Sequence, residues 1–561
     1  MHDDGFRHDR GAIGDYGTFK DMTLPVLSQS LFATNDMKPG YPFLLIALAI
    51  ALFSTDRVSL AEETLPNIVL IMVDDMGFSD IGCYGGETET PHLDSLANNG
   101  LRFTQFYNAG RCCPTRASLL TGLYQHQAGI GHMTSNSNHP SYQGFLNDRC
   151  VTIAEVLSTA DYFTAICGKW HVGSAPECWP LKRGFDRFYG TPQGGGHHYR
   201  NLPGRDLVLN DKVIPIPKDW YSTTAFTDYA IQFLEEGASA NQPVFLYVAY
   251  TAPHWPLQAP DDVIAKFRGR YAAGWQRIRE ARFQRQMEMG MFPRDTRLSP
   301  QDTKATAWSK VKDPEEIDLR MATHAAMVHL IDEGVGRIVS KLKQMDQLDN
   351  TLILFLSDNG ASAESGSTGF TGNRGGDPSA RTGTPDSYNS FGISGANMCD
   401  TPFRKYKMFV HEGGIATPLI AHWPRVIPSA LKGHFSNEVS HVIDLLPTCA
   451  KVAGVTYPDV FDGSSITPVA GRSLLPALTG KRLERPEGLF FEHQGNAAVR
   501  DGNWKLVRTH RKPWSLYDLA ADRTELQDVS SDHPELTLEL KKKWQTWAEQ
   551  AGVQPWPIKK K

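Results

Sequence analysis

Residues 67–75 read NIVLIMVDD, a run of apolar residues that ends in two aspartates. A short continuous run rich in Val, Ile and Leu is typical of a parallel strand that is buried on both faces of its sheet. The two aspartates, Asp74 and Asp75, stand where that strand would end. The stretch therefore predicts a central strand with acidic side chains at its carboxyl end.

The same plan recurs three times, in the segments 162–171, 243–256 and 351–360. Between them lie helical patterns, such as the apolar spacing from Val328 to Leu342, and strands that alternate with helices predict an α/β sheet with flanking helices. Ligands of open α/β sheets bind outside the carboxyl ends of the strands. The polar residues expected at those ends are Asp74, Asp75, Lys169, His171, His254, Asp358 and Asn359.

Four of these side chains form two matching oxygen-bearing pairs, Asp74 with Asp75 and Asp358 with Asn359. Hard oxygen ligands suit Ca²⁺ or Mg²⁺, whereas zinc prefers Cys and His. Ordinary polar capping of strand ends would explain one such pair. Two pairs favour a metal site.

Residues 111–122 read RCCPTRASLLTG and predict a helix with Pro114 in its first turn and Gly122 as its stop. Cys112 would then lie at the helix N-terminus, where the dipole and free N–H groups stabilise a thiolate or an oxyanion. Arg116 would project back toward the same place from one turn further on. The pattern predicts a nucleophile facing an anionic substrate; the alternative is a buried cysteine pair beside a helix start.

The composition is that of a soluble globular protein of 561 residues, with 41% hydrophobic residues and a net charge of −5. The charge gives no sign of a nucleic-acid partner, which needs a basic face. The eight cysteines would be able to pair in an oxidising compartment, but their spacing fixes no connectivity.

The N-terminal region predicts export. Residues 42–53, PFLLIALAIALF, follow Lys38 and form an apolar run too short to span a membrane comfortably; residues 59–61 have the form of a signal-peptidase site. We therefore expect a signal peptide at 37–61, a periplasmic or secreted protein and no stable membrane anchor, the alternative being an anchor that is retained. Residues 1–36 are expected to be a mis-annotated upstream extension.

Beyond residue 480 the pattern changes. Residues 489–509 suggest two short strands around a turn at 501–503, followed by a further strand and a terminal amphipathic helix at 535–550. The expected domains are therefore a catalytic domain at 62–480 and a small α+β domain at 481–561.

Two further segments are rich in small and polar residues. Residues 364–400, rich in Gly, Ser, Thr, Pro and Asn, are expected to form a long surface loop, and a loop of that length is more often functional than idle. Residues 194–200, GGGHHYR, suit a substrate-binding loop and a flexible turn equally well.

Six motifs in chain order carry a family resemblance. They are VDDMG (73–77), CCPTR (112–116), GKWH (168–171), APHWP (252–256), SDNG (357–360) and KYKMFVHEGG (405–414). Together they resemble the type I, formylglycine-dependent sulfatases, with an arylsulfatase-like pattern of Cys-x-Pro-x-Arg, over nearly the whole chain from about Pro66. Only Cys112 has Pro two places on and Arg four places on, so Cys113 occupies the motif's free position.

The resemblance implies an alkaline-phosphatase-like fold and a formylglycine that a formylglycine-generating enzyme makes from Cys112. It also implies one Ca²⁺ held by Asp74, Asp75, Asp358, Asn359 and residue 112. By the same resemblance Arg116 steadies the aldehyde hydrate, His171 contacts it, and Lys169, His254 and Lys407 bind sulfate. Lys405 is the alternative to Lys407.

The chemistry implied is hydrolysis of aryl or carbohydrate sulfate monoesters. One hydroxyl of the hydrate attacks sulfur with Asp358 as base, while His254, or alternatively Lys407, protonates the leaving alcohol. The second hydroxyl, deprotonated by His171, then expels sulfate. Two alternatives stay open: a phosphomonoester or phosphonate hydrolase on the same scaffold, and a catalytically silent relative that binds sulfated glycans.

Overall fold

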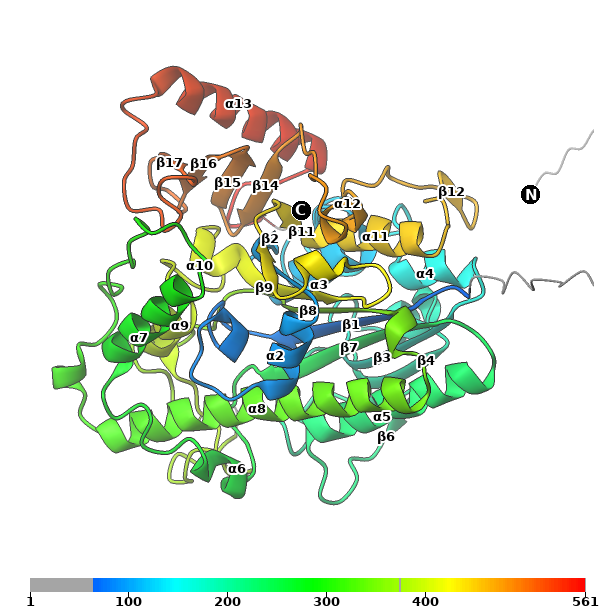
Figure 1. Cartoon of the computed structure of the whole chain (residues 1–561), viewed down its shortest axis with the longest axis horizontal. Coiled ribbons are helices and arrows are strands. Elements are labelled where there is room, and N and C mark those ends of the chain that lie inside the picture. The colour runs from blue at the N-terminus through cyan, green and yellow to red at the C-terminus, as the bar shows by residue number, and fades with distance from the viewer. Residues whose placement is uncertain (1–63, 373–374, 560–561) are drawn as a thin grey trace, which may run out of the picture. The chain divides into compact units, whose positions relative to one another are not determined.

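The computed structural model describes residues 64–372 and 375–559. The predicted signal peptide and upstream extension lie outside these residues. The main body is built on an eleven-stranded mixed sheet (Figure 1). Across this sheet the strands run in the order β10 (His434–Ser436), β2 (Leu101–Tyr107), β9 (Ala416–His422), β8 (Thr351–Ser357), β1 (Asn67–Asp74), β7 (Val244–Pro253), β3 (Phe163–Lys169), β4 (Arg187–Thr191), β5 (Leu207–Leu209) and β6 (Lys212–Ile214), and β11 (Ser440–His441) pairs with β2.

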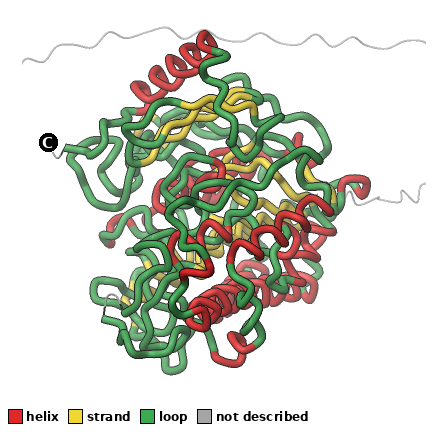
Figure 2. Tube along the Cα trace, turned by 90° about the vertical axis from the view of Figure 1, so that its left-hand side faces the viewer, coloured by secondary structure: helices red, strands yellow, loops and turns green. Residues whose placement is uncertain are grey.

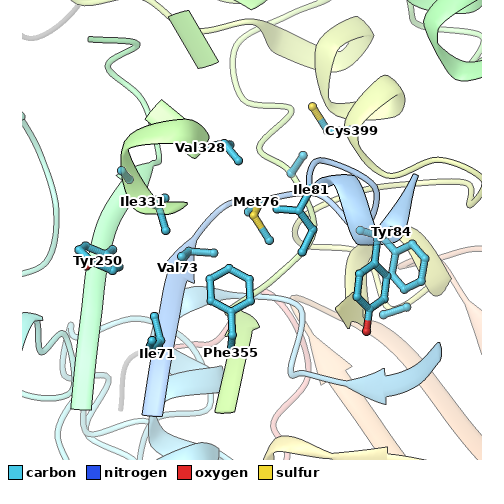
Figure 3. Close-up of a cluster of buried hydrophobic side chains, with 14 of the residues drawn as sticks. Ile71, Val73, Met76, Ile81, Tyr84, Tyr250, Val328, Ile331, Phe355 and Cys399 are labelled. Atoms are coloured by element: carbon cyan, nitrogen blue, oxygen red, sulfur yellow. The ribbon is translucent and has the colours of Figure 1, made fainter. Parts of the chain in front are cut away.

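The four strands expected from the sequence lie side by side as β8-β1-β7-β3, and every pairing among them is parallel. All eight residues of β1 are buried. Ile71 and Val73 face one core, where Figure 3 shows them beside Phe355, and Leu70 and Met72 face the other. Burial on both faces explains why the sequence of this strand is continuously apolar rather than alternating.

Helices cover both faces of the sheet, which confirms the predicted α/β class (Figure 1). Apolar residues of α2 (Pro91–Asn98), α5 (Ser222–Ser239) and α8 (Pro314–Gln344) complete the first core. Those of α3 (Cys112–Thr121), α4 (Ile153–Ser158), α11 (Leu445–Val452) and α12 (Leu475–Leu478) complete the second. The remaining elements of the main body are α6 (Asp261–Ala265), α7 (Trp275–Glu288), α9 (Gly392–Cys399), α10 (Glu412–Ile415) and the ribbon of β12 (Val460–Phe461) with β13 (Ser464–Ser465). Among the described residues, no helix has the length and apolarity needed to cross a bilayer.

The prediction of a surface loop over 364–400 is wrong for its last part. Residues 392–399 form α9, and Tyr388, Phe391 and Met398 are buried. The physical reason is that the segment is polar in composition but small-chained, so Gly, Ser and Ala allow its backbone to approach its neighbours closely. The side chain of Ser394, for example, accepts from the backbone N–H of Thr306 at 3.0 Å.

The C-terminal part is a four-stranded antiparallel sheet covered by one helix, seen at the top of Figure 2. Its elements are β14 (Leu489–His493), β15 (Asn496–Asp501), β16 (Trp504–Arg508), β17 (Ser515–Asp518) and α13 (Pro534–Ala551). The strand–turn–strand around 501–503 and the terminal helix are confirmed. The expectation of two strands over 489–509 is wrong, because Gln494 and Gly495, at φ 52° and 78°, form a second tight hairpin turn there.

A buried ion cluster joins this sheet to the main body. Lys505 of β16 lies 2.6 Å from Glu412 of α10 and 2.8 Å from Glu525, and all three side chains are fully buried. Tyr107 donates a hydrogen bond to Glu412 at 3.0 Å, and Arg523 pairs with the same carboxylate. The cluster makes the C-terminal sheet an integral part of the described fold.

Replacing Lys505 with methionine is expected to lower the free energy of unfolding by about 3 kcal/mol, because it leaves Glu525 buried without its cation. Urea unfolding followed by fluorescence measures this loss. The matched control is Lys543→Met, which breaks a partly exposed pair with Asp501 and should cost less than about 1 kcal/mol. Equal losses in the two variants would contradict a special role for the buried cluster.

Candidate active site

The predicted acidic strand ends meet at one edge of the sheet. The register of β1 against β8 places Val73 opposite Ser357, so Asp74 and Asp75 lie opposite Asp358 and Asn359. Asp75 has a left-handed backbone with φ 68°, and its N–H donates to Asp358 Oδ1 at 3.2 Å. Because of this turn, both consecutive aspartate side chains lie at the same edge of the sheet.

The oxygen atoms of this cluster fit a hard cation. Asn359 Nδ2 donates to Asp75 Oδ1 at 2.6 Å, which joins the two pairs. Asp74 Oδ1 and Asn359 Oδ1 are buried, and neither has a hydrogen-bond partner among the described residues. A buried oxygen without a partner is costly unless something else satisfies it. Carboxylate and amide oxygens in this arrangement are the ligands that Ca²⁺ or Mg²⁺ prefers.

Three buried cations surround the carboxylates. Lys169 Nζ lies 2.6 Å from Asp74 Oδ2, Lys407 Nζ lies 2.7 Å from Asp75 Oδ1, and Arg116 lies 2.8 Å from Asp358 Oδ2. Lys405 instead faces Asp302, at 3.3 Å. Of the two candidate lysines, it is therefore Lys407 that the structure places in the cluster.

The charges shift the acidity of these carboxyl groups in opposite directions. Burial alone would raise the pKa of Asp74, but Lys169, His254 and Arg116 outweigh it and hold that pKa well below its usual range. Burial and the negative charge of Asp74 raise the pKa of Asp358, and Arg116 opposes this only in part. Carboxyl groups with diverging acidities in one cluster are characteristic of functional sites.

Cys112 begins helix α3, as predicted, and Gly122 ends the helix with φ 67°. A hydrogen bond from Cys113 lowers the pKa of Cys112; burial opposes the shift, and the positive charge of Lys169 and a hydrogen bond from His171 reinforce it. Cys113 differs, because burial raises its pKa and its sulfur packs 3.7 Å from that of Met133. The two adjacent cysteines therefore have distinct environments: Cys112 contacts the charged cluster, and Cys113 packs against Met133.

Two histidines flank the cluster. His171, at φ 60°, hydrogen-bonds to Cys112, and burial together with Lys169 lowers its pKa to about 4. His254 Nε2 lies 3.4 Å from Asp75 Oδ2. Its carbonyl oxygen accepts from His198 Nε2 at 3.0 Å.

That contact decides between the two readings of residues 194–200. His198 is buried and also bonds to Ser222 Oγ at 2.9 Å, and a Cβ added at Gly194 would stand 2.8 Å from His171. The segment is a loop that packs against the histidines of the site, which favours the first alternative.

Sequence reasoning missed two charged residues beside the cluster. Arg111 and Glu364 form an ion pair at 2.9 Å, and Glu364 Oε2 accepts from Trp255 Nε1 at 3.0 Å. Arg111 immediately precedes the cysteine motif, which was a usable signal. Glu364 lies in the polar segment 364–400, where no sequence pattern distinguishes it.

All eight cysteines lie in the described part of the chain, and each is a free thiol there. The disulfides that an oxidising compartment would permit are therefore not part of this fold. Cys112 and Cys113, with Sγ atoms close to each other and to a ring nitrogen of His171, are the only adjacent pair.

The fold and the site together define the class of enzyme to which the protein belongs. Cys112 at a helix N-terminus, a cluster of carboxylate and amide oxygens, and buried cations meet at the carboxyl edge of an α/β sheet. This combination is typical of hydrolases that cleave esters of tetrahedral oxyanions. The chain belongs to the sulfatase family, whose members hydrolyse sulfate esters: the family model described as "Sulfatase" matches residues 66–455. A second model, "N-sulphoglucosamine sulphohydrolase, C-terminal", matches residues 403–550.

Similar proteins agree with this assignment. An uncharacterized sulfatase of Schizosaccharomyces pombe is 34% identical over 541 residues, covering 88% of this chain and 95% of its own. An arylsulfatase of Klebsiella aerogenes is 31% identical over 446 residues, covering 76% and 95%. The crystal structure of Ps i-CgsB in complex with k-i-k-neocarrahexaose is 28% identical with a TM-score of 0.66, covering 88% and 94%. The alkaline-phosphatase-like sulfatase fold expected from the motifs is thereby confirmed.

Proposed function

We propose that this sulfatase is calcium-dependent and cleaves sulfate monoesters with a formylglycine made from Cys112. The observation that carries the proposal is the convergence of Cys112, the four oxygen ligands and three buried cations at one sheet edge. When bound, Ca²⁺ would supply positive charge beside the transferring group, and the formylglycine hydrate would supply a nucleophile with two hydroxyls on one carbon. Asp74, Asp75, Asp358, Asn359 and residue 112 would hold the ion.

The chain's own cations bind and orient the sulfate. Lys169 and Lys407 are held in place by Asp74 and Asp75, and each ammonium has further N–H donors for sulfate oxygens. Arg116 is fixed by Asp358 and by the carbonyl of Lys169, at 3.1 Å, so it orients residue 112 from one helical turn away. Such preorganised charges stabilise the transition state without needing to reorganise during the reaction.

Two histidines and one carboxylate move protons in this proposal. Asp358 takes the proton of the attacking oxygen, and His254 delivers one to the leaving alcohol oxygen. Lys407 is the alternative donor. His171, bonded to residue 112, takes the proton from that residue's second oxygen so that sulfate is released.

Mass spectrometry of the purified active enzyme is expected to find the aldehyde at position 112 and an unmodified thiol at position 113. Only Cys112 lies at the helix start with Pro114 and Arg116 at the required spacing, whereas Cys113 packs against Met133. Co-expression with a formylglycine-generating enzyme should raise the modified fraction. An aldehyde at 113, or full activity with an intact thiol at 112, would refute the proposal.

The names of similar proteins support sulfated carbohydrates as the substrate class. They include N-acetylgalactosamine-6-sulfatases, such as the human enzyme at 28% identity, and a structure in complex with neocarrahexaose. We propose a carbohydrate sulfate as substrate, with aryl sulfates as reporters. A panel of sulfated sugars, steroids and phenols tests this, and a kcat/KM highest for a phenol would contradict it.

We also propose that the enzyme works in the periplasm or outside the cell, on the strength of the apolar run at 42–53 and the cleavage pattern at 59–61. Cell fractionation and N-terminal sequencing of the mature protein test this. A mature chain that retains residues 42–53 would contradict it.

A further inference from the structure

A carboxylate stands beside a site that binds anions. The side chain of Glu364 is 24% exposed, so it lies at the rim of the cluster rather than among the buried ligands. Burial would raise its pKa, but the positive charges of Lys407, Arg111 and His254 bring it to about 2, so the carboxylate is ionised at any working pH. A fixed negative charge here repels an anionic substrate and calls for an explanation.

Its contacts hold it in a single position. Arg111 lies 2.9 Å from Oε1, and Trp255 Nε1 donates to Oε2 at 3.0 Å. Both partners adjoin residues of the site, because Arg111 precedes Cys112 and Trp255 follows His254. The centroids of the His254 and Trp255 rings are 4.5 Å apart. Glu364 is therefore fixed between the segment that carries the nucleophile and the segment that carries the acid.

The charge of Glu364 acts differently on different substrates. A sulfate monoester carries one negative charge at the transferring group, whereas a phosphate monoester carries two near neutral pH. Because Coulomb energy is proportional to the ligand charge, one fixed negative charge disfavours a bound dianion about twice as strongly as a bound monoanion. The rim carboxylate lowers affinity for both esters but lowers it more for phosphate.

We propose that Glu364 sets the preference for sulfate over phosphate by offsetting one unit of the positive charge that Lys407 and Arg111 place at the site. The positive charge of Arg111 opposes the effect of Glu364, so the preference for sulfate depends on the relative influence of these two charges on the bound ester. This inference deepens the proposed function and rests on it. It assigns to Glu364 a specificity-determining role in a site shared by two tetrahedral esters.

The test compares 4-nitrophenyl sulfate with 4-nitrophenyl phosphate, which share a leaving group, at a pH where the phosphate is a dianion. Glu364→Gln is expected to lower the ratio of their kcat/KM values about tenfold. Arg111→Gln should shift the ratio the opposite way. Glu364→Asp, which keeps the charge, should stay near the wild-type ratio.

Two controls separate charge from structure. Glu235→Gln removes one negative charge on α5, where Glu235 pairs at the surface with Lys341 of α8, and should leave the ratio unchanged. In a Cys112→Ala background, which cannot turn over, equilibrium binding of phenyl phosphate relative to phenyl sulfate should strengthen when Glu364→Gln is added. This readout does not require chemistry.

The outcomes are distinct. Parallel losses for both esters, with an unchanged ratio in Glu364→Gln and Arg111→Gln, would mean that the pair only supports the fold and would overturn the inference. A wild-type enzyme with no sulfate turnover would instead overturn the proposed function. A lowered ratio that Glu364→Asp restores supports the inference.

Discussion

Serine in place of Cys112 is expected to give an enzyme that releases at most one product per active site and then stops. Serine Oγ gives its proton to Asp358 and attacks sulfur, the bond from sulfur to the leaving oxygen breaks, and the leaving alcohol takes its proton from His254. The product is a sulfate ester of the serine side chain. A hydrated formylglycine carries two hydroxyls on one carbon, and the second one expels the sulfate that the first has accepted. Serine has only one hydroxyl and cannot take this second step.

The structure explains why the first step should survive. Position 112 stays at the start of α3, and Arg116, Lys169 and Lys407 keep their carboxylate partners. Orientation and charge stabilisation are therefore retained, while only the release step is lost. We expect steady-state turnover to fall by at least about 10⁴-fold, since the nucleophile no longer regenerates.

Burst kinetics with an aryl sulfate, followed by intact-protein mass spectrometry, measure both parts of this prediction. The mass should rise by one SO3 unit, located at residue 112. The control is Cys113→Ala, which loses a packing contact with Met133 and should still turn over many times. Sustained turnover of Cys112→Ser would show that the second hydroxyl is dispensable.

Chelation of divalent metal is expected to lower activity by at least about 10³-fold, and Ca²⁺ is expected to restore it. Asp74 Oδ1 and Asn359 Oδ1 are buried oxygens that lack partners among the described residues, and a cation would satisfy both. The fold should persist without the ion, because Lys169, Lys407 and Arg116 already neutralise the three aspartates. Activity and circular dichroism should therefore respond differently to chelation.

Elemental analysis should find one calcium per chain, and Asp74→Asn should weaken its binding. Because the ion binds the folded state, saturating Ca²⁺ should also raise the thermal midpoint, with a gain in stability of about 2.7 kcal/mol at a hundredfold excess over Kd. The control Asp302→Asn removes a carboxylate that pairs with Lys405 away from the cluster and should keep the metal. Full turnover by a metal-free preparation would contradict the calcium proposal.

The parts of the fold that sequence predicts are those with a local signature. The strands β1, β3, β7 and β8 are continuous apolar runs, and helix α3 carries its proline and glycine signals at both ends. The four oxygen-bearing side chains and Lys169 follow directly from those strand ends, whereas Arg116 comes from α3 and Lys407 was indicated only by the family motif. No local signal gives the antiparallel insertion of β9 between β2 and β8, because strand pairing depends on residues far apart in the chain.

The residues that sequence missed depend on tertiary contacts. Glu364 is defined by Arg111 and Trp255, more than a hundred residues away in the chain, and in isolation it is one acidic residue in a polar segment. Helix α9 was missed because small polar residues are read as loop when their packing partners are unknown. The turn at Gln494 lacks the usual Asn or Asp before its glycine.

The buried cluster around Lys505 limits which truncations and domain exchanges the protein can tolerate. Lys505 and Glu525 belong to the C-terminal segment, whereas Glu412 lies five residues after Lys407. Nearby, Asn496 donates to the carbonyl of Met408 at 3.1 Å, so the C-terminal hairpin also braces the turn that carries Lys407. A chimera that exchanges the C-terminal segment between relatives must therefore transfer these charges as a set. An enzyme truncated near residue 480 would lose the contact that supports the turn carrying Lys407.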